Sequence, residues 1–477
     1  MSPTLQITFL LNDELITTQV IPGMVALDYL RKVRQLTGSK EGCKEGDCGA
    51  CTVIVGELQG DTVNYRPMTS CLLPMGELHG KHLVSIEGLN MEKLSPVQEA
   101  IHDCGGTQCG YCTPGFVVAM TAGLMDESIP LSKEGMDYAM SGNLCRCTGY
   151  RSIKAAGKQA IDKLAPLVKG QARIPALCEA SALPSTFLEA ADKLKSIPPI
   201  PDKPSGDSTP IVAGGTDLFV QRGEELPDSS PLLLNKSQAK ATVDLGEELS
   251  LDARMTFESF ARDPLVLANY PSVANYNPLM ASWPIRTRAT LAGNICNASP
   301  IADMTCLLLA LEANLIIETS DGDECIALKD FYLGYKKLAK EASDLVKEIR
   351  IPKASGETHL NWEKVSKRRI LDIATVNSAA KFEIVAGVIK SASLALGGVA
   401  ATPLYLEKTS ASLSGKELSP DLVRDALATA QTEFNPISDV RGSADYKRLL
   451  ARQLLAAHFT TLFPETINSE ELYASLR

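Results

Sequence analysis

Apolar and polar residues alternate along the first 85 residues in a way that predicts a small, strand-rich domain. The segments LQITFLLN and LITTQVIP have the period of an antiparallel hairpin with a turn at Asn12–Asp13. The later segment CTVIVGEL is rich in β-branched residues and predicts a further strand. Between them, ALDYLRKVRQLT carries apolar residues at helical spacing.

The pattern changes to helical spacing over residues 86–165. SPVQEAIHDCG begins with a Ser-Pro pair that is typical of the N-cap and first position of a helix. TPGFVVAMTAGLMDE and YRSIKAAGKQAIDKLAPLV continue the helical pattern. The pattern fades over residues 166–176, where we expect a linker.

The remaining residues mix both periods. STFLEAADKLKS predicts a helix, and the Pro-rich stretch IPPIPDKPSGDSTP predicts a loop before the strand and glycines of PIVAGGTDL. From about residue 360 longer strands alternate, LDIATVNSAAKFEIV and KSASLALGGVAA, and two helices follow them. We therefore predict an α+β multidomain protein with the divisions 1–85, 86–165, a linker at 166–176, 177–360 and 361–477.

Composition and charge narrow the class of protein. A length of 477 residues implies several domains, and a net charge of −10 argues against a nucleic-acid partner. No apolar run approaches 18 residues, so we expect no membrane segment. The first residues lack a basic stretch followed by an apolar block, so we expect no signal peptide and a cytoplasmic location.

The thirteen cysteines are unevenly distributed. In a cytoplasmic protein they are expected to be reduced thiols or metal ligands. Nine lie in the first 150 residues, at positions 43, 48, 51, 71, 104, 109, 112, 145 and 147, and four lie later, at 178, 296, 306 and 325. This distribution places metal chemistry in the N-terminal part, while Cys104 and the four later cysteines have no partner at ligand spacing and are expected to be ordinary packed thiols.

The first cysteine set has the spacing C-x4-C-x2-C-x19-C and comprises Cys43, Cys48, Cys51 and Cys71. Its first three members match the plant-type [2Fe–2S] pattern. Glycines at 42, 46 and 49 allow the tight loop that brings thiolates and backbone N–H groups together. The alternative is a structural zinc site, which usually uses two short pairs or histidines.

The second set is Cys109, Cys112, Cys145 and Cys147, spaced C-x2-C-x32-C-x-C. Spacing alone leaves an iron–sulfur cluster and a zinc site both open. Thr113-Pro114 predicts a helix start after the first pair, and Gly149 follows the second pair. We therefore expect each pair at a helix end, with the two ends facing each other.

Two glycine-containing stretches in the later part are candidates for phosphate binding. IVAGGTDL, residues 211–218, reads as a buried strand that runs through glycines into a helix N-terminus. ATLAGNICNASPIAD, residues 289–303, is dense in small residues and in hydroxyl and amide groups. Each could equally be a tight structural turn. No G-x-G-x-x-G follows a strand, so a Rossmann-type site is not supported.

At this point the motifs become specific to one family. KEGCKEGDCGACTV, followed by QCGYCTPG and GNLCRCTGY, resembles the two [2Fe–2S] centres of the molybdenum hydroxylase (xanthine oxidase) family, in the family's domain order. The resemblance implies a β-grasp plant-type ferredoxin domain over 1–85 and a helical-bundle [2Fe–2S] domain over 86–165. It also implies that Gln108 contacts a molybdopterin cofactor held by another chain.

The later stretches resemble the same family's flavin domain, a vanillyl-alcohol-oxidase-type FAD fold over 177–360, followed by a C-terminal antiparallel sheet and helices over 361–477. The resemblance implies that FAD is the third cofactor. The FAD-binding residues it implies are Ile211, Val212, Ala213, Gly214, Gly215, Thr216, Asp217, Leu218, Ala289, Thr290, Gly293, Asn294, Asn297, Asp303 and Lys364.

The function implied is electron transfer from a molybdenum centre through two [2Fe–2S] clusters to FAD and then to NAD+. No catalytic side chain is expected, and the five histidines are scattered. Leu371 stands where NAD-using relatives can carry an acid, and the KRR run at 367–369 is a candidate for attracting an anionic nucleotide.

Because no molybdopterin domain follows within the 477 residues, we expect a larger molybdopterin-binding partner, in a heterotetramer of two small and two large subunits. This resembles the small subunit of bacterial-type xanthine dehydrogenases, which oxidise hypoxanthine and xanthine to urate. The alternatives are an aldehyde or N-heterocycle hydroxylase, and, in another class, a stand-alone iron–sulfur flavoprotein carrier.

Overall fold

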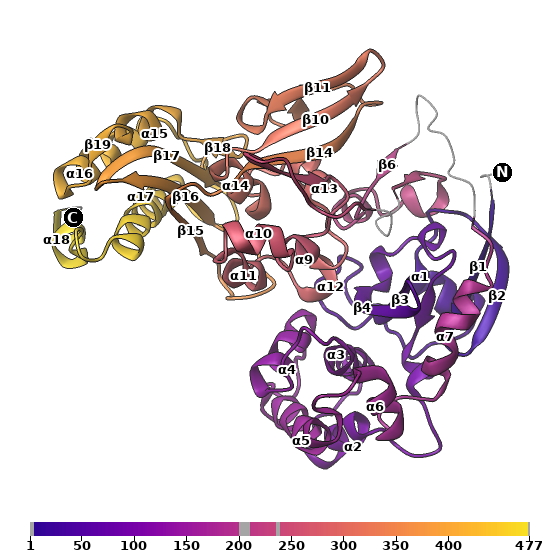
Figure 1. Cartoon of the computed structure of the whole chain (residues 1–477). Coiled ribbons are helices and arrows are strands. Elements are labelled where there is room, and N and C mark those ends of the chain that lie inside the picture. Colours follow the sequence, from indigo (N-terminus) through magenta and orange to yellow (C-terminus); the bar gives the residue numbers. More distant parts are fainter. Residues whose placement is uncertain (1–3, 200–209, 235–238, 476–477) are drawn as a thin grey trace. The chain divides into compact units, whose positions relative to one another are not determined.

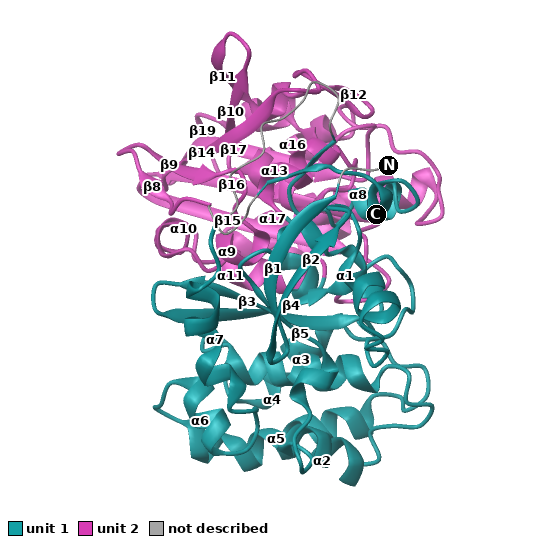
Figure 2. Cartoon of the chain, turned by 90° about the vertical axis from the view of Figure 1, so that its right-hand side faces the viewer, with its two compact units in different colours: residues 1–237, 282–289 teal, residues 238–281, 290–477 magenta. Residues whose placement is uncertain are grey.

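The computed structural model describes residues 4–199, 210–234 and 239–475. The chain divides into two compact units, residues 1–237 with 282–289 and residues 238–281 with 290–477 (Figure 2). These units do not follow the predicted boundary at residue 177, so the five-part division stays a prediction. Within the described part of the chain, no helix combines the length and the apolar character needed to cross a bilayer.

Unit 1 begins with a five-stranded mixed sheet in the order β2-β1-β5-β3-β4, of the β-grasp kind that was predicted (Figure 1). Alternate residues of the strands, such as Ile7, Phe9 and Val53, point into a core that also holds Leu30. The strands are β1 (Leu5–Leu11), β2 (Glu14–Val20), β3 (Thr52–Gln59), β4 (Thr62–Thr69) and β5 (His82–Val84). β1 and β2 form the predicted hairpin.

The segment predicted as one helix after this hairpin is shorter and less regular than expected. α1 covers only Ala26–Asp28 and passes into a π-helical turn over Tyr29–Val33. Its apolar residues still face the sheet, because Ala26, Tyr29 and Leu30 are all buried in the same core. Helical spacing thus predicted the buried face correctly but not the hydrogen-bond pattern.

The helical part of unit 1 is arranged around one completely apolar helix. The helices are α2 (Pro96–Asp103), α3 (Thr113–Met125), α4 (Lys133–Ala139), α5 (Arg151–Val168) and α6 (Arg173–Glu179). α2 begins at the predicted Ser-Pro pair, where Ser95 and Gln98 form a reciprocal capping box. α3 is buried from Gly115 to Met125, as expected of a helix that is apolar on every side.

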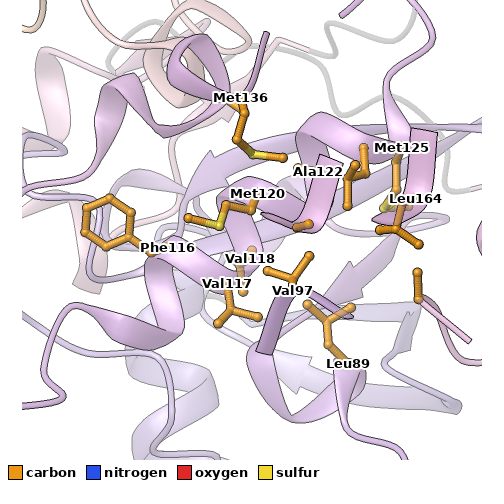
Figure 3. Packing of buried hydrophobic residues seen from close by; sticks show 14 of the residues in the cluster. Leu89, Val97, Phe116, Val117, Val118, Met120, Ala122, Met125, Met136 and Leu164 are labelled. Carbon is orange, nitrogen blue, oxygen red and sulfur yellow. The ribbon is translucent and has the colours of Figure 1, made fainter. Parts of the chain in front are cut away.

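Figure 3 shows how α3 packs: side chains such as Val118 and Met120 lie among Val97 of α2, Met136 of α4 and Leu164 of α5.

Two helices extend into residues 166–176, the stretch expected to be a linker. α5 runs to Val168 and α6 begins at Arg173, so the helical pattern is interrupted for only a few residues. Leu177 of α6 is buried in the core that holds α3. The local pattern faded because much of this stretch is polar and exposed, while tertiary packing keeps the two helices together.

Short elements complete unit 1. α7 (Thr186–Lys195), the predicted helix, packs Ala190 and Leu194 against Leu10 of β1. The others are β6 (Ile211–Val212), α8 (Leu218–Gln221), β7 (Leu232–Leu233) and α12 (Trp283–Arg286). Most of the predicted Pro-rich loop lies outside the described residues.

Unit 2 contains two antiparallel sheets. The first has the order β11-β10-β14-β9-β8 and consists of β8 (Val243–Asp244), β9 (Glu248–Asp252), β10 (Asn314–Thr319), β11 (Gly322–Ala327) and β14 (Leu345–Pro352). A small hairpin comprises β12 (Tyr332–Gly334) and β13 (Lys337–Leu338). The helices near this sheet in sequence are α9 (Phe257–Phe260), α10 (Pro264–Asn269), α11 (Val273–Tyr276), α13 (Leu291–Asn297) and α14 (Asp303–Ala310).

The second sheet of unit 2 is the predicted C-terminal antiparallel sheet. Its strands are β15 (Glu357–Val365), β16 (Val376–Val385), β17 (Val388–Gly397), β18 (Leu404–Tyr405) and β19 (Lys416–Glu417). The helices are α15 (Glu407–Leu413), α16 (Pro420–Ala430), α17 (Ala444–Leu462) and α18 (Ser469–Ser475). Phe382 and Leu394 of the sheet share a core with Val423 and Phe459 of the helices.

A completely buried histidine connects α17 to this sheet. Asn361 Nδ2 donates to His458 Nδ1 at 3.0 Å, so the ring proton is on Nε2, which donates to Ser378 Oγ at 2.8 Å. Ser378 in turn donates to the Ala395 carbonyl. The Ser378 hydroxyl gives its hydrogen to a carbonyl and not to the histidine, so His458 does not activate it as a nucleophile. This network is therefore structural.

Burial lowers the pKa of His458 to about 3 from 6.5. The unfolded chain takes up a proton below pH 6.5 and the folded chain does not, so unit 2 loses stability as the pH falls from 6.5 toward 3. Between pH 6.5 and pH 5, the free energy of unfolding of the wild-type protein should fall by about 2 kcal/mol because of His458. We expect this fall to be absent in His458→Gln. Denaturant unfolding of a Trp283→Phe background, in which Trp362 is the remaining tryptophan, measures this in unit 2.

His102, whose side chain is 79% exposed, provides the control. His102→Gln should keep the wild-type pH dependence. An unchanged pH dependence in His458→Gln would contradict the assignment.

Candidate functional site

The four sulfurs of the first cysteine set form two pairs. The Cys43 and Cys48 thiols hydrogen-bond each other, and this bond lowers the pKa of Cys43 to about 5 and raises that of Cys48. The Cys51–Cys71 hydrogen bond likewise lowers the pKa of Cys51 and raises that of Cys71. Hydrogen bonding within each pair thus favours the thiolate form of one member, and the thiolate is the form that ligates metals.

The loop that carries this set places backbone N–H groups against the sulfurs. Glu45 N–H donates to Cys43 Sγ at 3.3 Å, and Gly46 and Gly49 have left-handed backbone with φ of +77° and +68°. A Cβ atom on Gly42 would lie 2.6 Å from Cys48 Sγ. These contacts explain the glycines that the sequence pattern singled out, because a side chain at Gly42 would occupy the space of the sulfur.

The thiols of the second set are also paired two by two, Cys112 with Cys145 and Cys109 with Cys147. The two sequence pairs, CxxC and CxC, precede helix N-termini, as predicted. Cys112 is the N-cap of α3, and Cys145 and Cys147 precede the start of α5. Burial raises the pKa of Cys112 to about 12. Cys147 keeps its proton in a hydrogen bond to Cys109, and this bond raises the pKa of Cys147. Burial opposes the ionisation of Cys145, but its other contacts outweigh burial and lower its pKa.

Hydrogen bonds to Cys145 Sγ account for that lower pKa. They come from the Thr148 hydroxyl at 3.2 Å and from the Cys147 and Thr148 N–H groups at 3.5 Å, with a further contribution from Cys112. Gly110, with φ of +81°, allows the turn between Cys109 and Cys112. The second set thus has the same chemical character as the first.

The number of thiols in each set fits the ligand requirement of a [2Fe–2S] cluster. Over the described ranges, no group of three or more His, Cys, Asp or Glu side chains is arranged to hold a metal ion. A [2Fe–2S] cluster takes four thiolates, two on each iron. The pairs Cys43/Cys48 with Cys51/Cys71, and Cys112/Cys145 with Cys109/Cys147, fit that requirement. All thirteen cysteines are free thiols.

The two sets are in direct contact through their backbones. Leu144, next to Cys145, donates its N–H to the Cys48 carbonyl at 3.0 Å. Asn143 Nδ2 donates to the Gly49 carbonyl, also at 3.0 Å. A Cβ on Gly49 would lie 2.3 Å from the Gly142 carbonyl oxygen. The loop of the first set and the segment before Cys145 are therefore packed with no space for a side chain between them.

The first set also shares an apolar cluster with the glycine loop at 211–218. This cluster joins Cys51 and Cys71 to Val212, Phe219 and Leu226. Gln108, Cys109 and Cys147 of the second set are exposed. The first set therefore contacts both the second set and the glycine loop.

The glycine loop differs in detail from its prediction. β6 has two residues and α8 has four, so a long helix N-terminus does not provide the phosphate site. Gly215 has φ of +72°. The Gly215 and Thr216 N–H groups have no hydrogen-bond partner among the described residues. Successive free N–H groups around a left-handed residue form an anion-binding nest, which fits a pyrophosphate.

The second predicted segment begins with Ala289 in unit 1 and continues in unit 2, where its polar side chains mainly hold its own helices. Thr290 caps α13 by accepting the Gly293 N–H at 3.1 Å. Asn294 Oδ1 accepts from the Thr305 N–H and hydroxyl at 3.1 and 2.9 Å. The Asn297 side chain accepts from Lys336 Nζ at 3.1 Å. The hydrogen bonds of these side chains hold the segment to its own helices and to Lys336.

Asp303 and Lys364 are brought together in unit 2 as a buried ion pair of 2.7 Å at the start of α14. Asp303 also accepts from Asn377, and Lys364 also donates to the Leu279 carbonyl. Burial raises the pKa of Asp303, and Lys364 partly offsets this rise. The pair fixes the end of the predicted second segment.

Sequence reasoning missed three residues that connect the sites. Leu144 joins the two cysteine sets, and Arg288 with Glu77 joins the glycine loop to the turn after Cys71. The only local signal was the pair of arginines in PIRTRATLAG, which is unusual in a stretch of small and apolar residues. Cys104 donates its thiol hydrogen to Gln159 and joins neither set.

Comparisons with known proteins agree with this arrangement. Family models match a "2Fe-2S iron-sulfur cluster binding domain" over residues 9–75 and a "[2Fe-2S] binding domain" over 85–158. Others match an "FAD binding domain in molybdopterin dehydrogenase" over 181–354 and a "CO dehydrogenase flavoprotein C-terminal domain" over 363–462.

Similar proteins include xanthine dehydrogenase 1 of Arabidopsis thaliana, 29% identical over 88% of this chain and 37% of that protein. Aldehyde oxidase 1 of Rattus norvegicus is 28% identical over 93% of this chain and 38% of its own length. The chain therefore spans under two fifths of these relatives. A carbon monoxide dehydrogenase structure from Hydrogenophaga pseudoflava is 26% identical with a TM-score of 0.50, covering 55% of this chain and 92% of that chain.

Proposed function

Because the chain belongs to the molybdenum hydroxylase family, whose iron–sulfur and FAD domains it carries, we propose that it is the electron-transfer subunit of a xanthine dehydrogenase. When bound, the clusters carry electrons singly, and FAD collects two and releases them as a hydride. In this proposal Cys43, Cys48, Cys51 and Cys71 hold one [2Fe–2S] cluster, and Cys109, Cys112, Cys145 and Cys147 hold the other.

The observation that carries the proposal is the order of sites in unit 1. The second set, whose Cys109 and Cys147 are exposed, contacts the first through the Leu144–Cys48 hydrogen bond. The first set shares an apolar cluster with the glycine loop. Electrons entering at the second set would therefore pass the first set before reaching the flavin. Protein residues in this relay space the cofactors and exclude water, and none needs to act as an acid or a nucleophile.

FAD is assigned to the loop at 211–218, to Ala289, Thr290, Gly293, Asn294 and Asn297, and to Asp303 and Lys364. The nest at Gly215 and Thr216 would bind the pyrophosphate. The Asp303–Lys364 pair holds the start of α14 and so keeps the second segment in one conformation.

The molybdopterin is assigned to a larger partner subunit, in a heterotetramer of two small and two large subunits. The relatives extend well beyond the part that matches this chain, which supports a molybdenum-binding portion elsewhere. Gln108 lies exposed beside Cys109, where a partner's cofactor could reach it.

Purification of the native complex tests the substrate. We expect molybdenum to copurify with the chain, and xanthine and hypoxanthine to be oxidised with a higher kcat/KM than aldehydes. The similarity to an aldehyde oxidase makes an aldehyde or N-heterocycle hydroxylase the second candidate. Preference for aldehydes would select it, and a chain purified without molybdenum would contradict both.

NAD+ as final acceptor is tested at the basic run. Lys367, Arg368 and Arg369 are exposed, and Arg368 lies 3.8 Å from Asp372. We expect the Arg368→Gln/Arg369→Gln variant to raise the KM for NAD+ about tenfold, because two charges that attract an anionic nucleotide are lost. Lys416→Gln/Arg424→Gln, which also removes two exposed charges, is the charge-matched control. An unchanged KM in the double variant would rule out this role.

A further inference from the structure

One buried arginine connects the glycine loop to the domain that carries the first cysteine set. Arg288, in the segment Ser282–Ala289, has a completely buried side chain. Its guanidinium donates to both carboxylate oxygens of Glu77 at 3.2 Å. Its Nη2 also donates to the Gly214 carbonyl at 2.7 Å. Glu77 ends the short turn that follows Cys71, so the cation joins that turn to the loop.

The bond to Gly214 sets the orientation of one peptide group. In a trans peptide the C=O and the N–H point in opposite directions, and the described residues contain no cis peptide. The Gly214 carbonyl points toward Arg288, so the Gly215 N–H points away from it. Gly215 is the left-handed residue of the nest, and its N–H is free among the described residues. Arg288 thus fixes the direction of this free N–H.

The packing around this contact leaves the loop segment little freedom to shift. A Cβ on Gly214 would lie 2.3 Å from the Arg288 carbonyl oxygen. A Cβ on Gly23 would lie 1.9 Å from the Leu226 carbonyl oxygen, and one on Gly76 would lie 2.6 Å from Leu233 Cδ1. The segment that contains the glycine loop is therefore fitted against backbone on both sides of the Cys43–Cys71 region.

We propose that Arg288 and Glu77 are a positioning pair for the flavin. Arg288 holds the Gly214–Gly215 peptide with its N–H toward the FAD pyrophosphate, and Glu77 fixes Arg288 to the domain of the first cluster. The proposal rests on the proposed function, since it assumes that this loop binds FAD. An arginine is required because its planar fork satisfies the carboxylate and the carbonyl together, which a lysine cannot do.

The test measures FAD affinity in the full-length chain after its flavin has been removed. The Arg288→Met/Glu77→Met variant removes both charges, so no unpaired buried charge remains to unfold the protein. We expect it to bind FAD about tenfold to a hundredfold more weakly, because the Gly214 carbonyl has lost a charged donor. Arg288→Lys, which keeps a cation for Glu77, should retain the fold and show a similar loss.

Arg66→Met is the matched control. Arg66 forms an ion pair with buried Asp126 at 2.6 Å. This variant should lower the melting temperature and leave FAD affinity unchanged. If Arg288 had a purely structural role, the double variant, which is stable, would bind FAD as tightly as the wild-type chain. FAD binding within about twofold of wild type in the double variant and in Arg288→Lys would overturn the proposal.

The same titration separates this inference from the proposed function. Wild-type chain that binds no FAD would contradict both. Wild-type chain that binds FAD, with variants that bind it equally well, would overturn only the role of Arg288 and Glu77.

Discussion

Replacing Cys109 with alanine is expected to eliminate the second [2Fe–2S] signal and to leave the first intact. Cys109 and Cys147 form one of the two thiol pairs of the second set, so the variant leaves one iron with a single thiolate. Changes to residues that merely support metal ligands typically cost 10–100-fold in affinity or activity, and loss of a ligand costs more. We expect substrate-dependent NAD+ reduction to fall at least about a thousandfold.

Electron paramagnetic resonance of the dithionite-reduced protein measures this loss, with iron analysis and circular dichroism to verify the fold. Cys109 is exposed, so the substitution should not disturb the core. Cys104→Ala is the matched control, because Cys104 is nearby in the sequence but its thiol hydrogen-bonds Gln159 and no cysteine of either set. It should keep both signals. Two intact signals in Cys109→Ala would remove Cys109 from the ligand set.

The second large effect is expected at Gly49, where the two cysteine sets touch. A Cβ there would lie 2.3 Å from the Gly142 carbonyl oxygen and 2.6 Å from Asn143 Nδ2. The backbone also has φ of +68°, which disfavours any side chain. Gly49→Ala should therefore separate the two segments and break the Leu144–Cys48 hydrogen bond. We expect a loss of about 3 kcal/mol in stability and slower electron transfer between the clusters.

Gly60→Ala separates the effect of the left-handed backbone from the effect of the steric clash. Gly60 has a similar φ of +59°, but nothing lies within 4 Å of its Cβ position. It should lose only the backbone term of about 1 kcal/mol and keep normal electron transfer. Denaturant unfolding and freeze-quench spectroscopy of the two variants compare them directly. Equal behaviour of Gly49→Ala and Gly60→Ala would contradict a tight contact between the sets.

Local patterns predicted the longer elements of this fold well. The β1–β2 hairpin, the Ser95 cap of α2 and the apolar helix α3 all follow from periodicity and capping chemistry within a few residues of sequence. The cysteine spacings predicted two sets of four ligands, and this assignment stays a prediction. The structure adds the two-by-two pairing, which spacing alone did not predict.

Short elements were not predictable because neighbours far away in the sequence determine them. β6 and α8 are two and four residues long, so the strand–glycine–helix interpretation of residues 211–218 was too regular. The π-helical turn after α1 and the helix α6 inside the expected linker depend on burial against the sheet and against α3. A periodicity window averages over more residues than these elements contain.

Contacts between the sites could not be predicted from local sequence patterns, because the residues that form them are far apart in the sequence. Arg288 meets Glu77 across 211 positions of sequence, and Leu144 meets Cys48 across a predicted domain boundary. A single sequence shows a charged residue in an apolar stretch but not its partner. These contacts nevertheless determine the order of the sites, which is what supports electron transfer.

The central claim is that this chain carries electrons through two [2Fe–2S] clusters to FAD. The most direct measurement is an anaerobic titration of the purified native complex with xanthine, followed by electron paramagnetic resonance and by flavin absorption. The account predicts two distinct rhombic signals of equal intensity, bleaching of the flavin, and about four iron atoms and one FAD per chain. Zinc in place of iron, or xanthine that reduces neither the clusters nor the flavin, would contradict it.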